Sequence, residues 1–147
     1  MFTYVSDNAN NMVNGVNNAG LTHLGCFLHI LHLIITNSIF SQPGVENLIK
    51  KCKHIVTQNK KSSVEKHLFE SIEIDEEKDT SGYRLHQMVA IRWNSAFYML
   101  KQFQKIKPRL VLYLTNSEKC EPLSKQEWTK LDLVVKVLEP FESVSKM

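Results

Sequence analysis

The sequence predicts a mainly α protein with one residual β-strand at its front. Apolar side chains recur at three- and four-residue spacing through most of the chain, which is the period of an amphipathic helix. Only residues 2–5, which are aromatic and β-branched, indicate a strand. A length of 147 residues with 43% hydrophobic content suits one structural unit with a core.

The predicted strand ends at Ser6 and Asp7, and either residue can cap a helix that runs to about Asn18. A carboxylate at a strand end is also where two-metal nucleases hold Mg²⁺, but one carboxylate is not enough for two ions. We therefore favour the cap for Asp7. Because a lone strand is unstable, either other chains pair with it or the domain begins upstream.

A helix with a wide buried face is predicted from Cys26 onward and is ended by Pro43 and Gly44. Its apolar positions are Phe27, Ile30, Leu31, Ile34, Ile35 and Ile39. Cys26 and His29 are three residues apart, so they lie on one face of a helix and form half of a zinc-type ligand set. No second pair follows, and we favour a core cysteine with a hydrogen-bonded histidine.

A second helical run is predicted from Val45 to about Ile72, with a weak join at residues 60–63. Its lysines are Lys50, Lys51, Lys53, Lys60 and Lys61. The acidic stretch that follows, residues 70–79, is predicted to be an exposed loop. The lysines form either a solvated face or a stripe that faces DNA, and solvation is the commoner use of such a run.

The later helices carry stronger start signals. Asn94 is a candidate N-cap, with Trp93 and Tyr98 as the hydrophobic staple around it. Pro108 suits the first turn of the next helix. The apolar stripe between these two signals continues through Phe97, Leu100, Phe103 and Ile106.

Ser124 and Glu127 fit a capping box and predict the start of the last helix. Leu123 and Trp128 form the matching staple, and Pro140 predicts a kink or a break.

Composition narrows the class of protein. A formal charge of +3 permits contact with nucleic acid but does not argue for it. Three scattered cysteines indicate no disulfide framework, and we expect a reducing compartment inside the cell. No apolar run is long enough to cross a membrane. The common nucleotide-binding, zinc-protease and serine-hydrolase motifs are absent from the sequence.

Four blocks, taken in order, resemble the hAT family of transposases and the domesticated proteins with BED zinc fingers that descend from it. These blocks are "SDNANNM", "HLGCFLHILHLI", "IRWNSAFYML" and "EWTKLDLVVKVLEPFESVSK". The resemblance implies an RNase H-like catalytic fold interrupted by a large helical insertion. Residues 1–42 would be the rear part of that core, and residues 43–147 would be the insertion.

The resemblance also implies roles for particular residues. Asp7 takes the position of the second of three metal-binding carboxylates, and Cys26 with His29 matches the pair that borders the active site. Arg92 and Trp93 match a pair that lies against DNA, where the tryptophan can stack on an extruded base. The residues themselves favour a surface charge for Arg92 and a core position for Trp93.

Departures from the family pattern shape the functional expectation. The first and third carboxylates of the family lie outside the matched blocks, and His32 replaces the usual asparagine of the second block. We therefore expect a truncated, catalytically inactive transposase-derived protein of the nucleus with residual DNA binding. No cofactor is expected in this chain, although intact family members use Mg²⁺.

Three alternatives stay open. The first is a helical interaction module that packs against a second copy or another protein through apolar stripes. Those stripes are Phe97, Leu100 and Phe103, and Val134, Val135 and Leu138. The second is a fragmentary product without a selected function, and the third is part of a longer active or domesticated transposase.

Overall fold

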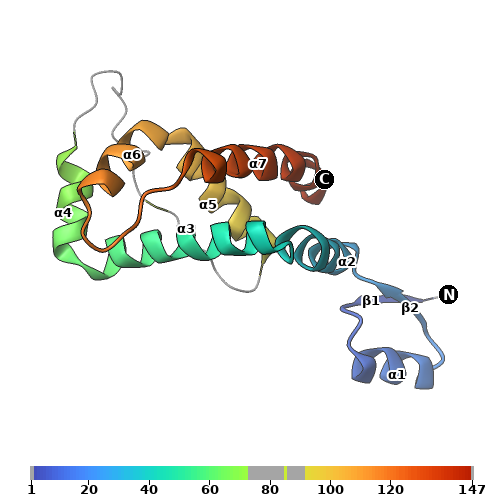
Figure 1. The fold of residues 1–147 in the computed structure, drawn as a ribbon. Helices are drawn as coiled ribbons and strands as arrows, with labels where there is room; N and C mark the ends of the chain where they lie inside the picture. The colour runs from blue at the N-terminus through green and yellow to red at the C-terminus, as the bar shows by residue number, and fades with distance from the viewer. Residues whose placement is uncertain (1, 73–84, 86–91, 147) are drawn as a thin grey trace. The chain divides into compact units, whose positions relative to one another are not determined.

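A computed structural model describes residues 2–72, 85 and 92–146 (Figure 1). Helices dominate these residues, so the mainly α class is confirmed. The chain divides into two compact units, Met1–Ser41 and Gln42–Met147, which are described here one at a time. Most of the acidic stretch predicted as a loop lies outside the described residues. None of the helices in the described segments is long and apolar enough to cross a bilayer.

The first unit is built around a parallel pair of strands. β1 (Thr3–Ser6) pairs with β2 (Thr22–Gly25), and α1 (Asn10–Asn18) connects them. The register places Thr3 opposite Thr22 and Ser6 opposite Gly25. The expectation of a lone strand is therefore wrong. The sequence pattern did not predict β2, because only one of its four residues is a large apolar residue and because its pairing with β1 is a non-local contact.

The predicted cap of α1 is also wrong. The helix begins at Asn10, and Ala9 is its N-cap with an extended backbone and no side-chain hydrogen bond. Asp7 lies two residues farther back, in the connection between β1 and α1. Its side chain is therefore not used as a helix cap.

The helix predicted from Cys26 exists but buries less than expected. α2 (Phe27–Ile34) continues into the π-helix η1 (Ile35–Phe40). Leu31 and Ile35 are buried, whereas Phe27 is 58% exposed. The wide buried face is therefore a wrong prediction for this chain. Pro43 does not end this helix; it lies in the first turn of the next one.

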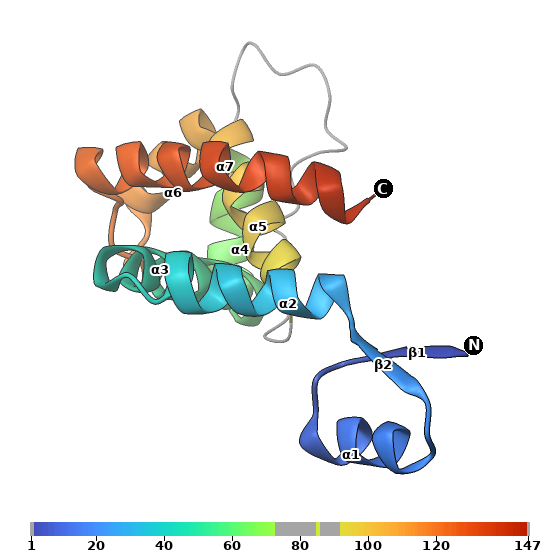
Figure 2. The ribbon, with the colours of Figure 1, turned by 90° about the vertical axis from the view of Figure 1, so that its right-hand side faces the viewer.

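The second unit contains the larger core. Its helices are α3 (Pro43–Lys61), α4 (Ser63–Ser71), α5 (Trp93–Lys105), α6 (Lys107–Asn116) and α7 (Lys125–Ser145). In two views α5 lies between the long helices α3 and α7 (Figures 1 and 2). The core side chains come from all five helices and include Leu48, Ile55, Phe69, Phe103, Leu110 and Leu131.

Short-range signals located most of these helices. The join after residue 60 is at Ser62, whose hydroxyl accepts a hydrogen bond from the backbone N–H of Glu65 and caps α4. Pro108 lies in the first turn of α6, as predicted. Ser124 and Glu127 form the complete capping box at the start of α7. Pro140 does not break α7, which continues to Ser145.

The start of α5 differs from the prediction. Arg92 is the N-cap and Trp93 is already helical, so Asn94 is not the cap. The predicted staple is wrong as well, because Trp93 packs on Phe97, with ring centroids 6.3 Å apart. Tyr98 is instead 39% exposed and donates a hydrogen bond to Glu142 of α7 at 2.6 Å.

The apolar stripes considered for a partner are part of this core. Phe97, Leu100 and Phe103 are fully buried, and Val134, Val135 and Leu138 are at most 5% exposed. They pack within the chain, so the interaction module cannot use them in this fold.

Candidate functional site

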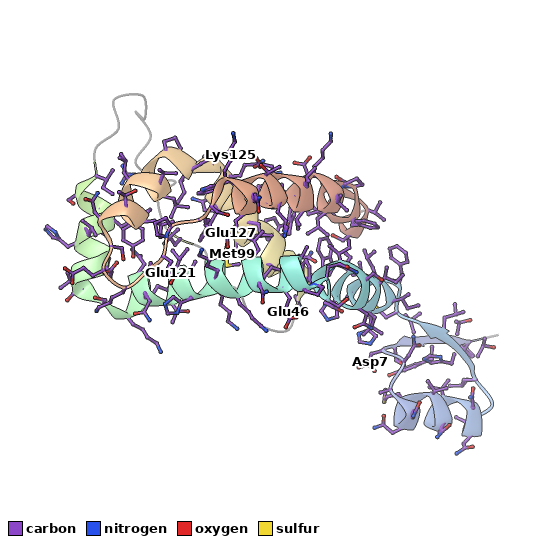
Figure 3. The ribbon with its side chains drawn as sticks, viewed as in Figure 1. Asp7, Glu46, Met99, Glu121, Lys125 and Glu127 are labelled. Carbon is purple, nitrogen blue, oxygen red and sulfur yellow. The ribbon has the colours of Figure 1, made fainter. Side chains whose placement is uncertain are left out.

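The carboxyl ends of β1 and β2 bring the acid block and the Cys-His pair to one edge of the sheet. Asp7 directly follows β1, and Cys26 directly follows β2. The backbone N–H of Cys26 donates to the carbonyl of Ser6 at 2.8 Å, which holds the two strand ends together. In open parallel sheets this edge is the usual place for a binding site. Figure 3 shows Asp7 in this first unit.

Ser6 and His23 meet beside Asp7. The Ser6 hydroxyl lies 2.9 Å from Nε2 of His23 and donates to the Asp7 carbonyl, also at 2.9 Å. A serine hydroxyl has one proton, so while Ser6 donates to the Asp7 carbonyl, its contact with His23 uses the tautomer that carries a proton on Nε2. In that tautomer His23 donates to Ser6 and does not act as the base that activates a serine.

Cys26 and His29 are close but do not complete a metal site. Cys26 is the half-buried N-cap of α2, and its carbonyl accepts from the N–H of His29 at 3.1 Å. The rings of His29 and His32 are 6.4 Å apart. Within residues 2–72, 85 and 92–146, no group of three His, Cys, Asp or Glu side chains could hold an ion. These residues fit neither a two-ion magnesium site nor a structural zinc site.

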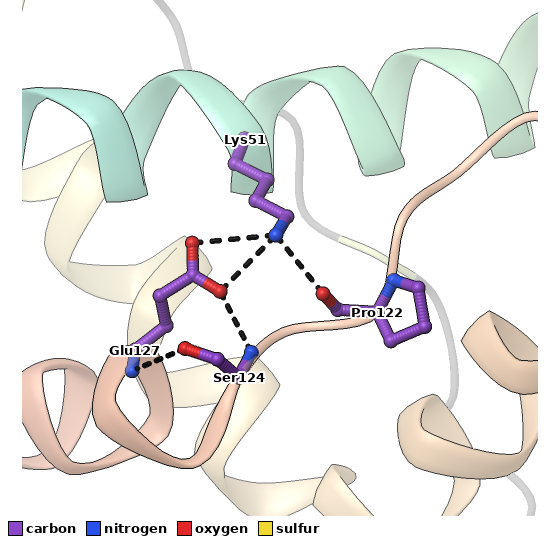
Figure 4. A network of polar contacts seen from close by, with 4 residues as sticks. All are labelled: Lys51, Pro122, Ser124 and Glu127. Atoms are coloured by element: carbon purple, nitrogen blue, oxygen red, sulfur yellow. Dashed lines mark hydrogen bonds and ion pairs between the residues drawn. The ribbon is translucent and has the colours of Figure 1, made fainter.

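The five lysines of α3 do not act alike. Lys51 is largely withdrawn from solvent and donates to the Pro122 carbonyl at 2.9 Å and to the Glu127 carboxylate at 3.1 Å (Figure 4). Lys50 is exposed and pairs with Glu46 at 2.6 Å. The remaining three, Lys53, Lys60 and Lys61, are exposed.

The Lys51 contact has an electrostatic signature. Partial burial alone would raise the pKa of Glu127. The carboxylate accepts hydrogen bonds from the Ser124 backbone N–H and from Lys51, and these bonds lower its pKa below the usual value. The carboxylate is thus shared between the cap of α7 and a lysine of α3. Lys51 is a tertiary contact of the fold, not part of an open basic stripe.

The Arg-Trp pair is divided between surface and core. Arg92 is exposed at the N-cap of α5, whereas Trp93 is 4% exposed and packs on Phe97. In this arrangement the indole face is not open to a base. The structure thus favours the core position for Trp93, and its contact with DNA stays a prediction.

A buried carboxylate was missed from the sequence. Glu65 is 3% exposed and accepts from the hydroxyls of Tyr113 at 2.6 Å and Ser117 at 2.7 Å. Burial, followed by the hydrogen bond to Glu65, raises the pKa of Tyr113. These partners are far from Glu65 in sequence, so no local pattern marked them. The cluster ties α4 to α6 and its following turn.

Comparison with known proteins places the chain in a family. Residues 24–137, most of the chain, match the model of the ZBED1 RNase-like helical domain. The chain belongs to this family. The resemblance to hAT-derived, BED-type proteins is therefore confirmed.

Individual relatives are much longer than this chain. It is 27% identical over 146 residues to zinc finger BED domain-containing protein 6 of Homo sapiens and, equally, of Mus musculus. It is 27% identical over 142 residues to zinc finger BED domain-containing protein 4 of Homo sapiens. These matches cover 97% of the chain but only 14% and 12% of the relatives. No solved structure matches it significantly.

Proposed function

We propose that this chain is a domesticated transposase segment that binds DNA through the exposed lysines of α3 and does not cut it. The observation that carries the proposal is the separation of the α3 lysines into two groups. Lys51 donates to α7, whereas the side chains of Lys53, Lys60 and Lys61 are exposed, and Lys60 also has an interaction within the chain. Phosphate contacts need accessible cations, which the second group provides.

The spacing of these lysines suits a nucleic-acid backbone. Lys53 and Lys60 are seven residues apart, which is about 10 Å along a helix axis. They therefore reach separate phosphates, since phosphates along one strand repeat at about 3.4 Å of axial rise. Lys50 contributes less, because Glu46 neutralises part of its charge.

Matched variants test this binding surface. Fluorescence anisotropy of a labelled DNA duplex is measured with the full chain, with Lys53→Met and with Lys51→Met. We expect Lys53→Met to weaken binding by several-fold, because one phosphate contact is lost. Lys51→Met should leave affinity unchanged at a temperature where both variants are folded. Equal losses from both variants, or no DNA binding by the wild type, would overturn the proposal.

The proposal that the chain does not cleave DNA rests on its lack of further carboxylates beside Asp7 in the first unit. Asp7 is the acid at the sheet edge, and two-metal phosphodiester chemistry needs several carboxylates around both ions. Residues 1–41 contain no other Asp or Glu, and the described part of the chain gathers no group of three His, Cys, Asp or Glu that could hold an ion. The test is nicking of supercoiled plasmid in the presence of Mg²⁺ or Mn²⁺. Nicking by the wild type that disappears with Asp7→Asn would show the proposal to be wrong.

Location in the nucleus belongs to the same proposal. The relatives are named for a zinc-finger domain, a class of module that often reads DNA. A transposase-derived protein that contacts DNA would act where DNA is. Imaging of the tagged chain in cells, with exclusion from the nucleus as the contrary result, tests this point.

A second candidate is association of the first unit with a second copy of the chain. Several large apolar side chains are exposed there, among them Phe2, Val5, Phe27, Leu28 and Ile34. A helix that is apolar on all sides is normally covered. An apolar interface resists salt, whereas phosphate contacts weaken steeply as salt rises. Sedimentation at low and high salt distinguishes the two, since self-association that persists at high salt supports this candidate.

A further inference from the structure

Two contacts with β2 meet the segment that carries Asp7. The first is the hydrogen bond from His23 to Ser6, whose hydroxyl in turn donates to the Asp7 carbonyl. The Cys26 N–H fixes the Ser6 carbonyl at 2.8 Å. The residue before Asp7 is therefore held through both its side chain and its backbone.

The second contact lies on the other side of Asp7. The Asn8 side chain passes directly over Gly25, where an added Cβ would come within 2.7 Å of Asn8 Oδ1 and 3.2 Å of its Cγ. Real Cβ atoms essentially never approach so closely, so the Asn8 amide can sit there only because residue 25 has no side chain. Gly25 has an ordinary backbone φ, so a side chain at this position would disturb the close approach of the Asn8 side chain and not a left-handed backbone conformation.

We propose that β2 clamps the segment Ser6–Asn8 at these two points, so that His23 and Gly25 are positioning residues for Asp7. The clamp fixes the peptide on both sides of the acid and thereby limits where the carboxylate can lie at the sheet edge. This inference goes beyond DNA binding by α3 and does not depend on it, because the two features lie in different units.

Backbone order at Asp7 is the direct readout. The ¹⁵N relaxation order parameter is measured for residues 6–8 in the full-length chain, where about 0.85 marks a rigid backbone and less than about 0.6 a flexible one. We expect rigid values for the wild type. Gly25→Ala should lower them towards the flexible range, because the new methyl group displaces Asn8.

Gly15→Ala is the matched control. Gly15 lies in α1 of the same unit, and an added Cβ there meets nothing within 4 Å. This variant should leave the order of residues 6–8 unchanged. The double variant Gly25→Ala with Asn8→Ala removes the clash and should restore order at Asp7. Unchanged order in Gly25→Ala would overturn the second contact point.

Two variants test whether the hydrogen-bond donor of His23 positions Ser6 and Asp7. His23→Gln keeps an N–H group that can reach Ser6, whereas His23→Phe keeps a ring but has no donor. We expect order at Ser6 and Asp7 to be kept in the first variant and lost in the second. Order parameters of α1, in the same unit, report whether a variant has unfolded that unit as a whole. Equal behaviour of the glutamine and phenylalanine variants would contradict a positioning role for His23.

Discussion

At the residue scale, chemically identical side chains have different tasks because of where the helix directs them. Lys51 and Lys53 are two positions apart on α3, so they point to different sides. One donates to Glu127 and Pro122, and the other is exposed. The sequence showed a run of lysines but not this division, because the partners of Lys51 lie more than seventy residues away.

Lys51→Met should reduce the free energy of unfolding by about 1–2 kcal/mol, since a charged hydrogen-bond donor to a partly buried carboxylate is lost. Lys53→Met should change it by less than about 0.5 kcal/mol, as is usual for an exposed side chain. Urea unfolding measures both. A larger loss for the Lys53 variant would contradict the assignment.

The same contact predicts a pH dependence. The pKa of Glu127 is lower in the folded chain than in the unfolded chain, where it is near 4.5. The contribution of Glu127 to the free energy of unfolding is therefore complete above the unfolded pKa and is lost as pH falls through the lowered one. The difference in stability between wild type and Lys51→Met should therefore shrink in acid. Unfolding curves at neutral pH and below pH 4.5 check this, and a difference that grows in acid would oppose it.

At the scale of elements, capping signals placed the later helices α6 and α7 correctly but failed for α1 and α5. α7 begins where Ser124 and Glu127 predicted, and α6 begins around Pro108. The failures share a physical cause. β2 exists through its pairing with β1, and α5 starts at Trp93 where the indole packs on Phe97. Such tertiary contacts override local preference and cannot be read from a single segment.

Pro140 offers a test within α7. It lies inside a helix that continues past it, although proline removes one backbone hydrogen bond and crowds the preceding turn. Pro140→Ala should therefore raise the free energy of unfolding by about 1–3 kcal/mol. Thermal and urea unfolding measure the change. A loss of stability would indicate that the bend or packing at Pro140 is required by the fold.

The Glu65 cluster should control how firmly α4 is attached. Tyr113→Phe removes a 2.6 Å donor to a buried carboxylate and should cost about 1–3 kcal/mol. Tyr98→Phe, which removes the exposed hydrogen bond to Glu142, is the matched control and should cost less. Limited proteolysis and urea unfolding follow the change. Equal costs for the two variants would argue against a special role for the buried cluster.

At the scale of the whole molecule, the family motifs predicted more about the protein than the periodicity of its apolar residues did. The order of the four motifs identified the family, and the periodicity identified the mainly α class. The juxtaposition of Asp7 with Cys26 depends on a parallel strand pair that the periodicity did not reveal. Contacts such as Asn8 on Gly25 depend on backbone approach, which leaves little trace in a single sequence.

The central claim is that exposed lysines of α3 bind DNA phosphates, and the salt dependence of affinity tests it most directly. For three phosphate contacts, the logarithm of the binding constant should fall with the logarithm of salt concentration with a slope of about −2.7. Replacing Lys53, Lys60 and Lys61 together by methionine should remove most of that slope. An unchanged slope in the triple variant, or an affinity indifferent to salt in the wild type, would contradict the account.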